Sequence, residues 1–270
     1  MNQCDLCGET GSLATPGDPS GKIRICKGCG FVHVKERRSL AEVAAAWTDI
    51  YKSGGYDPEC PGVKARLFYV AEWLDQTVGL RGKSVLDIGA GNGQFLAYCR
   101  DRGADPIGLD PDRDNVAKIN ARGITCIDGW ASDDRLAPNG QFDLVTLNWT
   151  LENTADCLAV LRYAKRCLAP GGHVVVSTGS RILTPFKKPL SSYLPLDPNY
   201  PHDTHCFRWS LHSLNYAAGL CHLAPWTRND FYQRDEMLHA FVAAPGISGW
   251  PHDSPNEVED HFRRWQTCFP

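Results

Sequence analysis

A short apolar strand that leads into a glycine-rich turn and then into a helix constrains this chain more than any other feature. The strand is Ser84–Ile88, the turn is Gly-Ala-Gly-Asn-Gly at 89–93, and the helix begins at 94–96. Glycines let a ligand approach the backbone closely, and the start of a helix presents N–H groups that have no partner inside the helix. Asp110 closes the next apolar strand, 19 residues after Gly91, where a carboxylate can bind both hydroxyls of a ribose. The pattern therefore predicts a ligand site at the carboxyl ends of these two strands.

Further apolar segments continue an alternation of strands and helices along the chain. An amphipathic helix is expected at 63–78, before the first strand. Strands are expected at 124–127, 142–148 and 173–177, and apolar residues at helical spacing predict a helix between the last two. Strands and helices that alternate in this way predict an α/β fold with a doubly wound parallel sheet.

Composition excludes several classes of protein. The 270 residues are 43% apolar and 22% charged, so the chain can bury a core and is not disordered. The net charge of −3 gives no overall positive field that would attract nucleic acid or an anionic membrane. No apolar run approaches the roughly 20 residues that span a bilayer. The first residues lack the basic and apolar segments of a signal peptide, so we expect a cytoplasmic protein with reduced thiols.

Four of the twelve cysteines form two matched pairs near the N-terminus. They are spaced Cys4-x-x-Cys7 and Cys26-x-x-Cys29. Each pair can bring two thiolates to one ion from a single tight turn, and two pairs complete a tetrahedral four-sulfur site that suits Zn²⁺. We therefore expect a structural zinc ribbon over residues 1–38. A redox-active dithiol is the alternative interpretation.

Four stretches of the chain, taken in order, resemble the class I S-adenosylmethionine (SAM)-dependent methyltransferases. They read VLDIGAGNGQFL, GLDPD, FDLVTLNWTLEN and LAPGGHVVVST. The resemblance covers residues 63–245 and implies a Rossmann-like, seven-stranded, mostly parallel sheet whose last strand, at 237–243, runs antiparallel. Paired cysteines followed by a tyrosine loop, within a linker at 39–62, resemble the bacterial sugar and natural-product methyltransferases found with polysaccharide and nucleotide-sugar pathways. That resemblance implies methyl transfer from SAM to a hydroxyl of a sugar, a nucleotide-sugar or a related small metabolite.

The resemblance assigns eight residues to the SAM site: Asp87, Gly89, Gly91, Gly93, Asp110, Asp128, Trp130 and Asn148. Asp87 and the three glycines match the loop that cradles the methionine part of SAM, and Asp110 matches the acid that binds the ribose. Asp128 and Trp130 match the adenine region, although Trp130 can equally be a core residue. Asn148 follows the strand whose backbone carbonyls meet the SAM ammonium in the family.

The chain departs from the family after this strand. The family often has Glu-His where this chain has Glu152-Asn153. Related quinone methyltransferases hold a metal with Glu-x-x-Glu-His, and the corresponding residues here are Trp149, Glu152 and Asn153. This substitution pattern argues against a catalytic metal at that place.

The methyl acceptor is expected under an insertion at 179–208, which covers the acceptor pocket in the family. His205 is the first candidate for a base that removes a hydroxyl proton, and His202 is the second. A histidine that only fixes the loop by hydrogen bonds is the alternative. Four aromatic residues could line the acceptor site or simply pack in loops: Tyr51, Tyr56, Tyr193 and Tyr200.

Two other functions remain open from the sequence. A methyltransferase for RNA or protein could use the ribbon for docking, although residues 1–38 hold only six basic and four acidic side chains. A SAM-binding protein without catalysis is the other alternative, against which the intact glycine turn argues. In the C-terminal extension at 246–270, Val258, Phe262 and Trp265 have helical spacing, which predicts a capping helix or a subunit contact.

Overall fold

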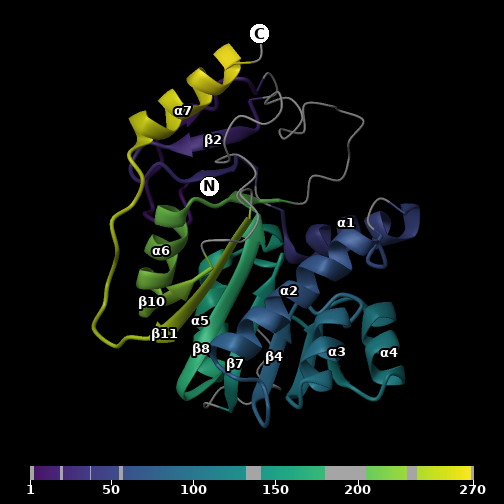
Figure 1. Cartoon of the computed structure of the whole chain (residues 1–270). Helices are drawn as coiled ribbons and strands as arrows, with labels where there is room; N and C mark the ends of the chain where they lie inside the picture. The colour runs from purple at the N-terminus through teal and green to yellow at the C-terminus, as the bar shows by residue number, and fades with distance from the viewer. Residues whose placement is uncertain are drawn as a thin grey trace.

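The structure is a computed structural model that describes residues 3–18, 21–36, 38–54, 57–131, 141–179, 205–229 and 236–268. Its main body is a seven-stranded sheet in the order β10-β11-β8-β7-β4-β5-β6 (Figure 1). The strands are β4 (Ser84–Ile88), β5 (Asp105–Asp110), β6 (Thr125–Asp128), β7 (Phe142–Asn148), β8 (Leu168–Gly179), β10 (Leu223–Arg228) and β11 (Glu236–Ala243). Neighbours among β4 to β8 are parallel, and β11 runs antiparallel between β8 and β10. The predicted fold class, including the antiparallel last strand, is confirmed.

Helices cover both faces of this sheet because alternate strand residues point to opposite sides. Val85, Leu144 and Val175 are buried against the helices on one face, whereas their chain neighbours Leu86 and Val145 are buried on the other. The first face carries α2 (Pro61–Thr77) and α3 (Gln94–Asp101), and the second carries α5 (Cys157–Cys167) and α6 (Leu211–Leu220). α4 (Arg113–Ala121) packs beside β5 and β6.

The ends of several elements differ slightly from the sequence prediction. The expected strand at 173–177 is the centre of the longer β8, and the expected helix at 63–78 begins at Pro61 and ends at Thr77. Proline suits the first turn of a helix because its missing N–H would have no partner there. α1 (Leu40–Ser53) begins at a capping box between Ser39 and Glu42.

The N-terminal segment that holds the paired cysteines, called the ribbon below, is part of the same packed structure as the main body. Its strands β1 (Ser12–Ala14), β2 (Ile23–Cys26) and β3 (Val32–Val34) form an antiparallel sheet, to which the main body adds β9 (Phe207–Arg208). The Phe31 ring stacks on Phe207 at 5.7 Å between centroids and lies 5.0 Å from Trp209. Buried ribbon residues and buried strand residues of the main sheet therefore belong to one continuous core.

The C-terminal helix α7 (Pro255–Cys268) closes the other side of the ribbon, as Figure 1 shows beside β2. Val258, Phe262 and Trp265 are buried against Ile23 and Ile25. Of the two roles predicted for this apolar stripe, the structure shows a capping helix.

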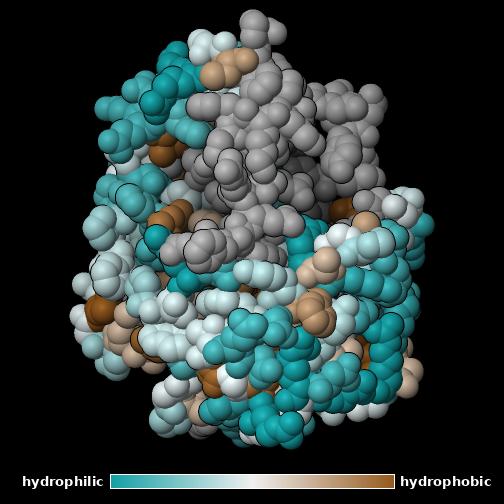
Figure 2. Space-filling model, viewed as in Figure 1, coloured by the Kyte–Doolittle hydropathy of each residue, from teal (hydrophilic) through white to brown (hydrophobic). Residues whose placement is uncertain are grey.

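The described surface in the view of Figure 2 is mostly hydrophilic, with apolar residues scattered over it. Single exposed apolar residues of this kind are normal on a folded protein. Among the helices that the structure describes, none combines the length and the apolar composition that crossing a membrane requires.

Candidate functional site

The glycine turn lies at the carboxyl end of β4, and its three glycines face different surroundings. All three have positive φ angles, of 76° at Gly89, 55° at Gly91 and 75° at Gly93. A Cβ at Gly89 would lie 2.5 Å from Thr150 Oγ1, and one at Gly93 would lie 2.5 Å from Ile119 Cγ1. A Cβ at Gly91 would meet only Tyr51 Oη, at 3.5 Å. Packing within the protein thus explains Gly89 and Gly93, and Gly91 is the position with room for a ligand.

Asp110 ends β5 beside this turn and organises it. Its Oδ2 accepts a hydrogen bond from Gly91 N at 2.8 Å, and its Oδ1 accepts one from Asp112 N at 2.9 Å. Only 5% of the residue is exposed, so it is not a solvated carboxylate at a strand end. Burial raises the pKa of Asp110 to about 6, against the opposing effect of these hydrogen bonds. Oδ1 also accepts a bond from Asn115 Nδ2 at 3.4 Å, whereas Oδ2 can accept a second bond from a ligand hydroxyl.

Asp87 and Asn148 form a buried polar pair at the ends of β4 and β7. Asp87 Oδ1 accepts hydrogen bonds from Thr146 Oγ1 at 2.6 Å and from Asn148 Nδ2 at 3.1 Å. Burial raises the pKa of Asp87 to about 7. Asn148 Oδ1 is buried and has no hydrogen-bond partner among the described residues. A buried acceptor without a partner is costly, so this pair fits a ligand that brings a donor or a positive charge.

Asp128 and Trp130 follow β6 on the other side of Asp110. Asp128 pairs with Asp110 in the sheet register, and its Oδ2 accepts a bond from Arg113 Nε at 3.0 Å. Trp130 is half-buried and belongs to none of the buried clusters in the described part of the chain. Both residues thus lie in the neighbourhood predicted for an adenine ring.

The segment expected as a linker lies over the glycine turn, and the sequence predicts that Tyr51 and Tyr56 of this segment lie beside the acceptor site. Thr48 Oγ1 donates to Asp112 Oδ2 at 3.5 Å, and Asn92 Nδ2 donates to Glu59 Oε1 at 2.9 Å. Tyr51 Oη lies near Gly91, as described above. α1 and the start of α2 therefore cover the turn from outside, and only the clustering of polar residues at 48–59 hinted at this.

A strained turn follows β7. Trp149 has a positive φ of 51°, which is uncommon for a bulky residue, and its N–H donates to Ser177 O at 2.7 Å. Arg66 of α2 lies over the Trp149 ring at 4.9 Å. In η1 (Leu151–Asn153), the buried Glu152 accepts a bond from Thr178 Oγ1 at 2.8 Å, and Asn153 Nδ2 donates to Trp149 O at 2.8 Å. The side chains of Glu152 and Asn153 thus hold the turn and the end of β8 together.

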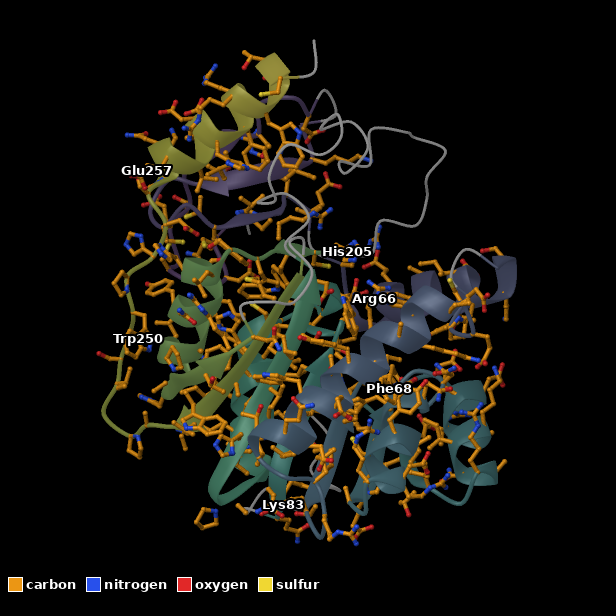
Figure 3. All side chains as sticks on the ribbon, viewed as in Figure 1. Arg66, Phe68, Lys83, His205, Trp250 and Glu257 are labelled. Carbon is orange, nitrogen blue, oxygen red and sulfur yellow. The ribbon has the colours of Figure 1, made fainter. Side chains whose placement is uncertain are left out.

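His205 is the one predicted acceptor-side histidine within the described residues. It is half-buried two residues before β9, and its carbonyl oxygen accepts a bond from Arg208 Nη1. Figure 3 places His205 and Arg66 toward the ribbon end of the sheet, opposite Lys83 at the amino end of β4. The other predicted acceptor-side residues lie outside the described residues: Tyr56, Tyr193, Tyr200 and His202.

The four paired cysteines come together in the ribbon. Their Sγ atoms all lie within 4.8 Å of one another, with 3.6 Å between Cys4 and Cys29 and 3.4 Å between Cys7 and Cys26. Zn–S bonds of about 2.3 Å in a tetrahedron separate the sulfurs by about 3.8 Å, so the donor set and spacing fit one zinc ion. Four sulfur ligands leave no open position on the metal, which suits a structural role.

Comparison with known proteins agrees with this geometry. A family described as a methyltransferase domain matches residues 63–220. The ubiquinone biosynthesis O-methyltransferase of Vibrio parahaemolyticus is 34% identical over 156 residues, which are 56% of this chain and 64% of that protein. The enzyme of the same name from Aliivibrio fischeri (strain ATCC 700601 / ES114) is 30% identical over 181 residues, 64% of this chain and 75% of that protein.

Solved structures show the same fold at lower identity. The 1,6-didemethyltoxoflavin-N1-methyltransferase of Burkholderia thailandensis, solved with S-adenosylhomocysteine, superposes with a TM-score of 0.57 at 16% identity, over 86% of this chain and 100% of that one. A SAM-dependent methyltransferase from Mesorhizobium loti gives a TM-score of 0.52 at 21% identity, over 65% of this chain and 99% of that one. With a match over more than half of its length and this sheet order, the chain belongs to the methyltransferase-domain family and is a class I SAM-dependent methyltransferase.

Proposed function

We propose that this enzyme transfers the methyl group of SAM to a hydroxyl oxygen of a small metabolite, with a sugar or nucleotide-sugar as the first acceptor class. SAM binding is supported by the space beside Gly91, which lies between the buried hydrogen-bond acceptors of Asp110 and Asn148. The name O-methyltransferase, shared by the matched relatives, supports oxygen as the acceptor atom. The sugar class rests on the resemblance of the paired cysteines and tyrosine loop at the N-terminus.

The residues of this chain would divide the work between the two sides of the reacting methyl. SAM supplies an activated methyl on a sulfonium. Gly91 would admit the cofactor backbone, Asp110 would accept bonds from the ribose hydroxyls, and Asn148 Oδ1 would accept one from the ammonium. On the acceptor side, His205 would take the hydroxyl proton while the oxygen attacks in line. Positioning and exclusion of water supply most of the rate in such a transfer.

A ubiquinone-type acceptor is the second candidate, because the matched relatives carry that pathway in their name. The two candidates separate in one experiment. Purified protein is incubated with methyl-labelled SAM and either nucleotide-sugars, sugar phosphates or hydroxylated quinone precursors, and products are identified by mass spectrometry. Label on a sugar hydroxyl supports the first acceptor class. Label only on the quinone precursors contradicts the first class and supports the second. Label in a cell extract that disappears after ribonuclease treatment would contradict both.

The glycine turn offers a paired test of the cofactor site. Gly91→Ala should weaken SAM binding by about tenfold or more while the protein still folds, because the added Cβ meets only Tyr51 Oη, at an ordinary contact distance of 3.5 Å. The positive φ of 55° adds a backbone strain of about 1–2 kcal/mol, which the positive φ of Gly93 imposes on Gly93→Ala as well. Gly93→Ala should instead lower thermal stability, because its Cβ would overlap Ile119. Calorimetric SAM affinity and melting temperature of both variants check this pair. Unchanged affinity in Gly91→Ala would show that the cofactor lies elsewhere.

Asp110 should contribute directly to cofactor affinity. Asp110→Ala is expected to weaken SAM binding by about 1–3 kcal/mol, the scale of hydrogen bonds to a charged group. Asp110→Asn keeps one side-chain acceptor for Gly91 N, so its SAM affinity should lie between those of Asp110→Ala and the wild type. Calorimetry with S-adenosylhomocysteine provides the ranking. Equal affinity in all three proteins would limit Asp110 to holding its own loop.

SAM affinity should rise with pH. The ammonium of SAM bound near Asp87 would favour the ionised carboxylate of this residue over the neutral acid. Burial raises the pKa of Asp87 to about 7, so the carboxyl is largely neutral in the free protein below that pH. In that free protein its contribution to folding is fully present below its unfolded pKa of about 4 and is lost as pH rises towards 7. We expect affinity to increase by about tenfold or more from pH 5.5 to 7.5, with proton release on binding. Calorimetry in buffers of different ionisation enthalpy measures both, and Asp87→Asn should flatten the dependence.

A further inference from the structure

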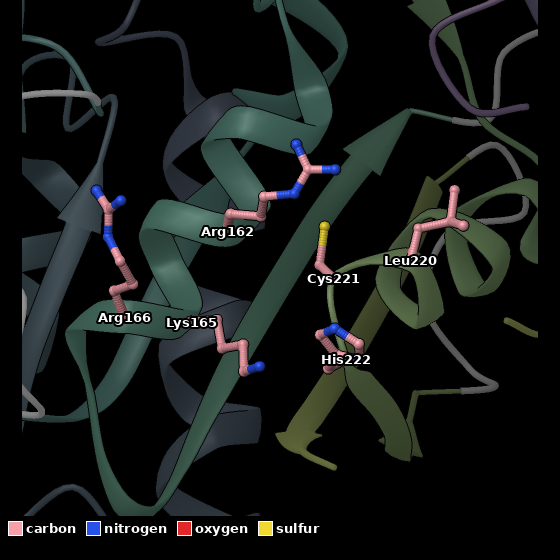
Figure 4. A pocket seen from close by; sticks show the side chains of 6 residues that line it. All are labelled: Arg162, Lys165, Arg166, Leu220, Cys221 and His222. Atoms are coloured by element: carbon pink, nitrogen blue, oxygen red, sulfur yellow. The ribbon is translucent and has the colours of Figure 1, made fainter. Parts of the chain in front are cut away.

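A pocket of about 310 Å³ lies between the second half of α5 and the turn that joins α6 to β10 (Figure 4). Its lining residues are Arg162, Lys165, Arg166, Leu220, Cys221 and His222. α5 ends immediately before β8 begins, and His222 immediately precedes β10. The pocket therefore lies at the amino ends of the strands, at the opposite edge of the sheet from the glycine turn.

Basic side chains outnumber acidic ones around this pocket, although the charge of Asp156 also reaches Cys221. No acidic residue lines it, and neither Arg162 nor Lys165 takes part in an ion pair within the described part of the chain. Asp156, at the other end of α5, uses its carboxylate to cap the helix by accepting a bond from Ala159 N at 2.9 Å. The C-terminal end of a helix attracts basic side chains, which accounts for Lys165 and Arg166 in the last turn. This attraction does not account for Arg162, which lies one turn earlier in α5.

Figure 4 shows how the three cations are directed. Arg162 and Lys165 extend toward Cys221 and His222, whereas Arg166 leaves the helix on the other side. Arg166 instead lies 5.5 Å from the ring centroid of Tyr163. A guanidinium on the Cys221 side and an ammonium on the His222 side therefore line one pocket, and the third cation serves as a comparison.

The other wall of the pocket is fixed by its own contacts. Cys221 is buried, and its thiol donates to Leu158 O at 3.6 Å. His222 has a positive φ of 57°, and its Nδ1 lies 2.6 Å from Ile247 O. Because a carbonyl oxygen only accepts, Nδ1 carries the proton and the ring is held at the rim. Cys221 and His222 therefore form a fixed wall beside the exposed Arg162 and the half-buried Lys165.

We propose that this pocket binds an anion of the phosphate class through Arg162 and Lys165, at a site separate from methyl transfer. Arginine suits phosphate oxygens because its donors form a planar fork, and lysine adds a point charge. Two cations match the double charge of a phosphate monoester, and the volume leaves room for an attached group. The ligand can be a free inorganic anion or a phosphorylated metabolite, which share this chemistry.

Calorimetry with pyrophosphate, inorganic phosphate and glycerol 3-phosphate tests the site in the full-length protein. Arg162→Gln and Lys165→Gln should each weaken pyrophosphate binding by about tenfold or more, the scale of a lost charge-assisted bond. The matched control Arg166→Gln should change it by less than about twofold. Tighter binding of the ester than of either inorganic anion would identify a phosphorylated metabolite, and the reverse would identify a free anion.

Several outcomes would overturn the proposal. Absence of binding by the wild type at millimolar pyrophosphate would do so. Equal weakening in all three variants would show diffuse surface charge, and an oligonucleotide bound more tightly than pyrophosphate with the same loss in Arg166→Gln would show an extended polyanion surface. S-adenosylhomocysteine affinity, measured in parallel, should stay unchanged in every variant because the cofactor site lies at the opposite edge of the sheet. Because neither measurement requires a methyl acceptor, the test of this pocket does not depend on the acceptor proposed above.

Discussion

Replacing Cys26 by serine should destabilise the whole protein and not the ribbon alone. We expect a loss of about 4 kcal/mol or more in folding free energy, because losing a ligand of a structural zinc site removes metal binding that is coupled to folding. For a chain of this size that corresponds to a fall in melting temperature of about 10 °C or more. Cys26 is fully buried, and Cys4, Cys26 and Cys29 belong to the same continuous core as the main sheet.

The contacts around the second cysteine pair explain why the effect should spread. Phe31, two residues after Cys29, packs on Phe207 and Trp209 of the main body. On the other side, a Cβ at Gly30 would lie 2.8 Å from Asp253 Cβ, so this turn is in tight contact with the segment before α7. The Asp253 carboxylate in turn accepts a hydrogen bond from Ser210 Oγ, at the start of α6. Loosening the metal site therefore releases contacts with both α6 and the C-terminal segment.

The measurement combines metal content with thermal unfolding. Elemental analysis of protein purified without chelators should give one zinc per chain in the wild type and less in Cys26→Ser. Cys268→Ser is the matched control, because Cys268 is exposed and distant from the sulfur cluster in sequence and should leave the melting temperature unchanged. A zinc-free wild type would refute the metal site, and an unshifted melting temperature in Cys26→Ser would refute the structural coupling.

The main fold could be predicted because its signals are local. The alternation of apolar strands and amphipathic helices, with glycines at the turn after β4, depends on residues close together in sequence. The cysteine spacing likewise predicted a cluster that the structure brings within 4.8 Å. β9 could not be predicted, because two residues carry no periodicity and pair with β3 only through tertiary structure. Helical spacing identified the buried face of α7 but could not say which surface it meets.

In the candidate site, too, some features have a local sequence signal and others depend on tertiary structure. Asp110 and the glycines follow from strand ends, which the sequence marks. The hydrogen bond between Asn92 and Glu59 joins residues 33 positions apart and has no sequence signal. The unpartnered Oδ1 of Asn148 also emerges only when Asp87 occupies the amide nitrogen of the same side chain. Long-range polar contacts of this kind decide what a site can bind, and they require the folded structure.

Replacing His205 by alanine should lower turnover by about 10²–10⁴-fold if this histidine removes the acceptor proton. S-adenosylhomocysteine affinity should stay nearly unchanged, because the proposed cofactor residues lie on or directly after β4 to β7 and His205 lies two residues before β9. The backbone around His205 is held in place, because β9 pairs with β3 and Arg208 donates to the His205 carbonyl.

A structural role for His205 makes a different prediction, and the two can be separated. If the imidazole only fixes the loop, His205→Ala should lower the melting temperature together with turnover, and His205→Asn should restore both by supplying hydrogen bonds. If it is the base, His205→Asn should fold like the wild type and remain as inactive as the alanine variant, because an amide cannot take up the proton. His212→Ala, at an exposed position of α6, is the control that should keep both turnover and stability. Full activity in His205→Ala would remove it from the mechanism and leave His202, Asp203 or positioning alone to account for the rate.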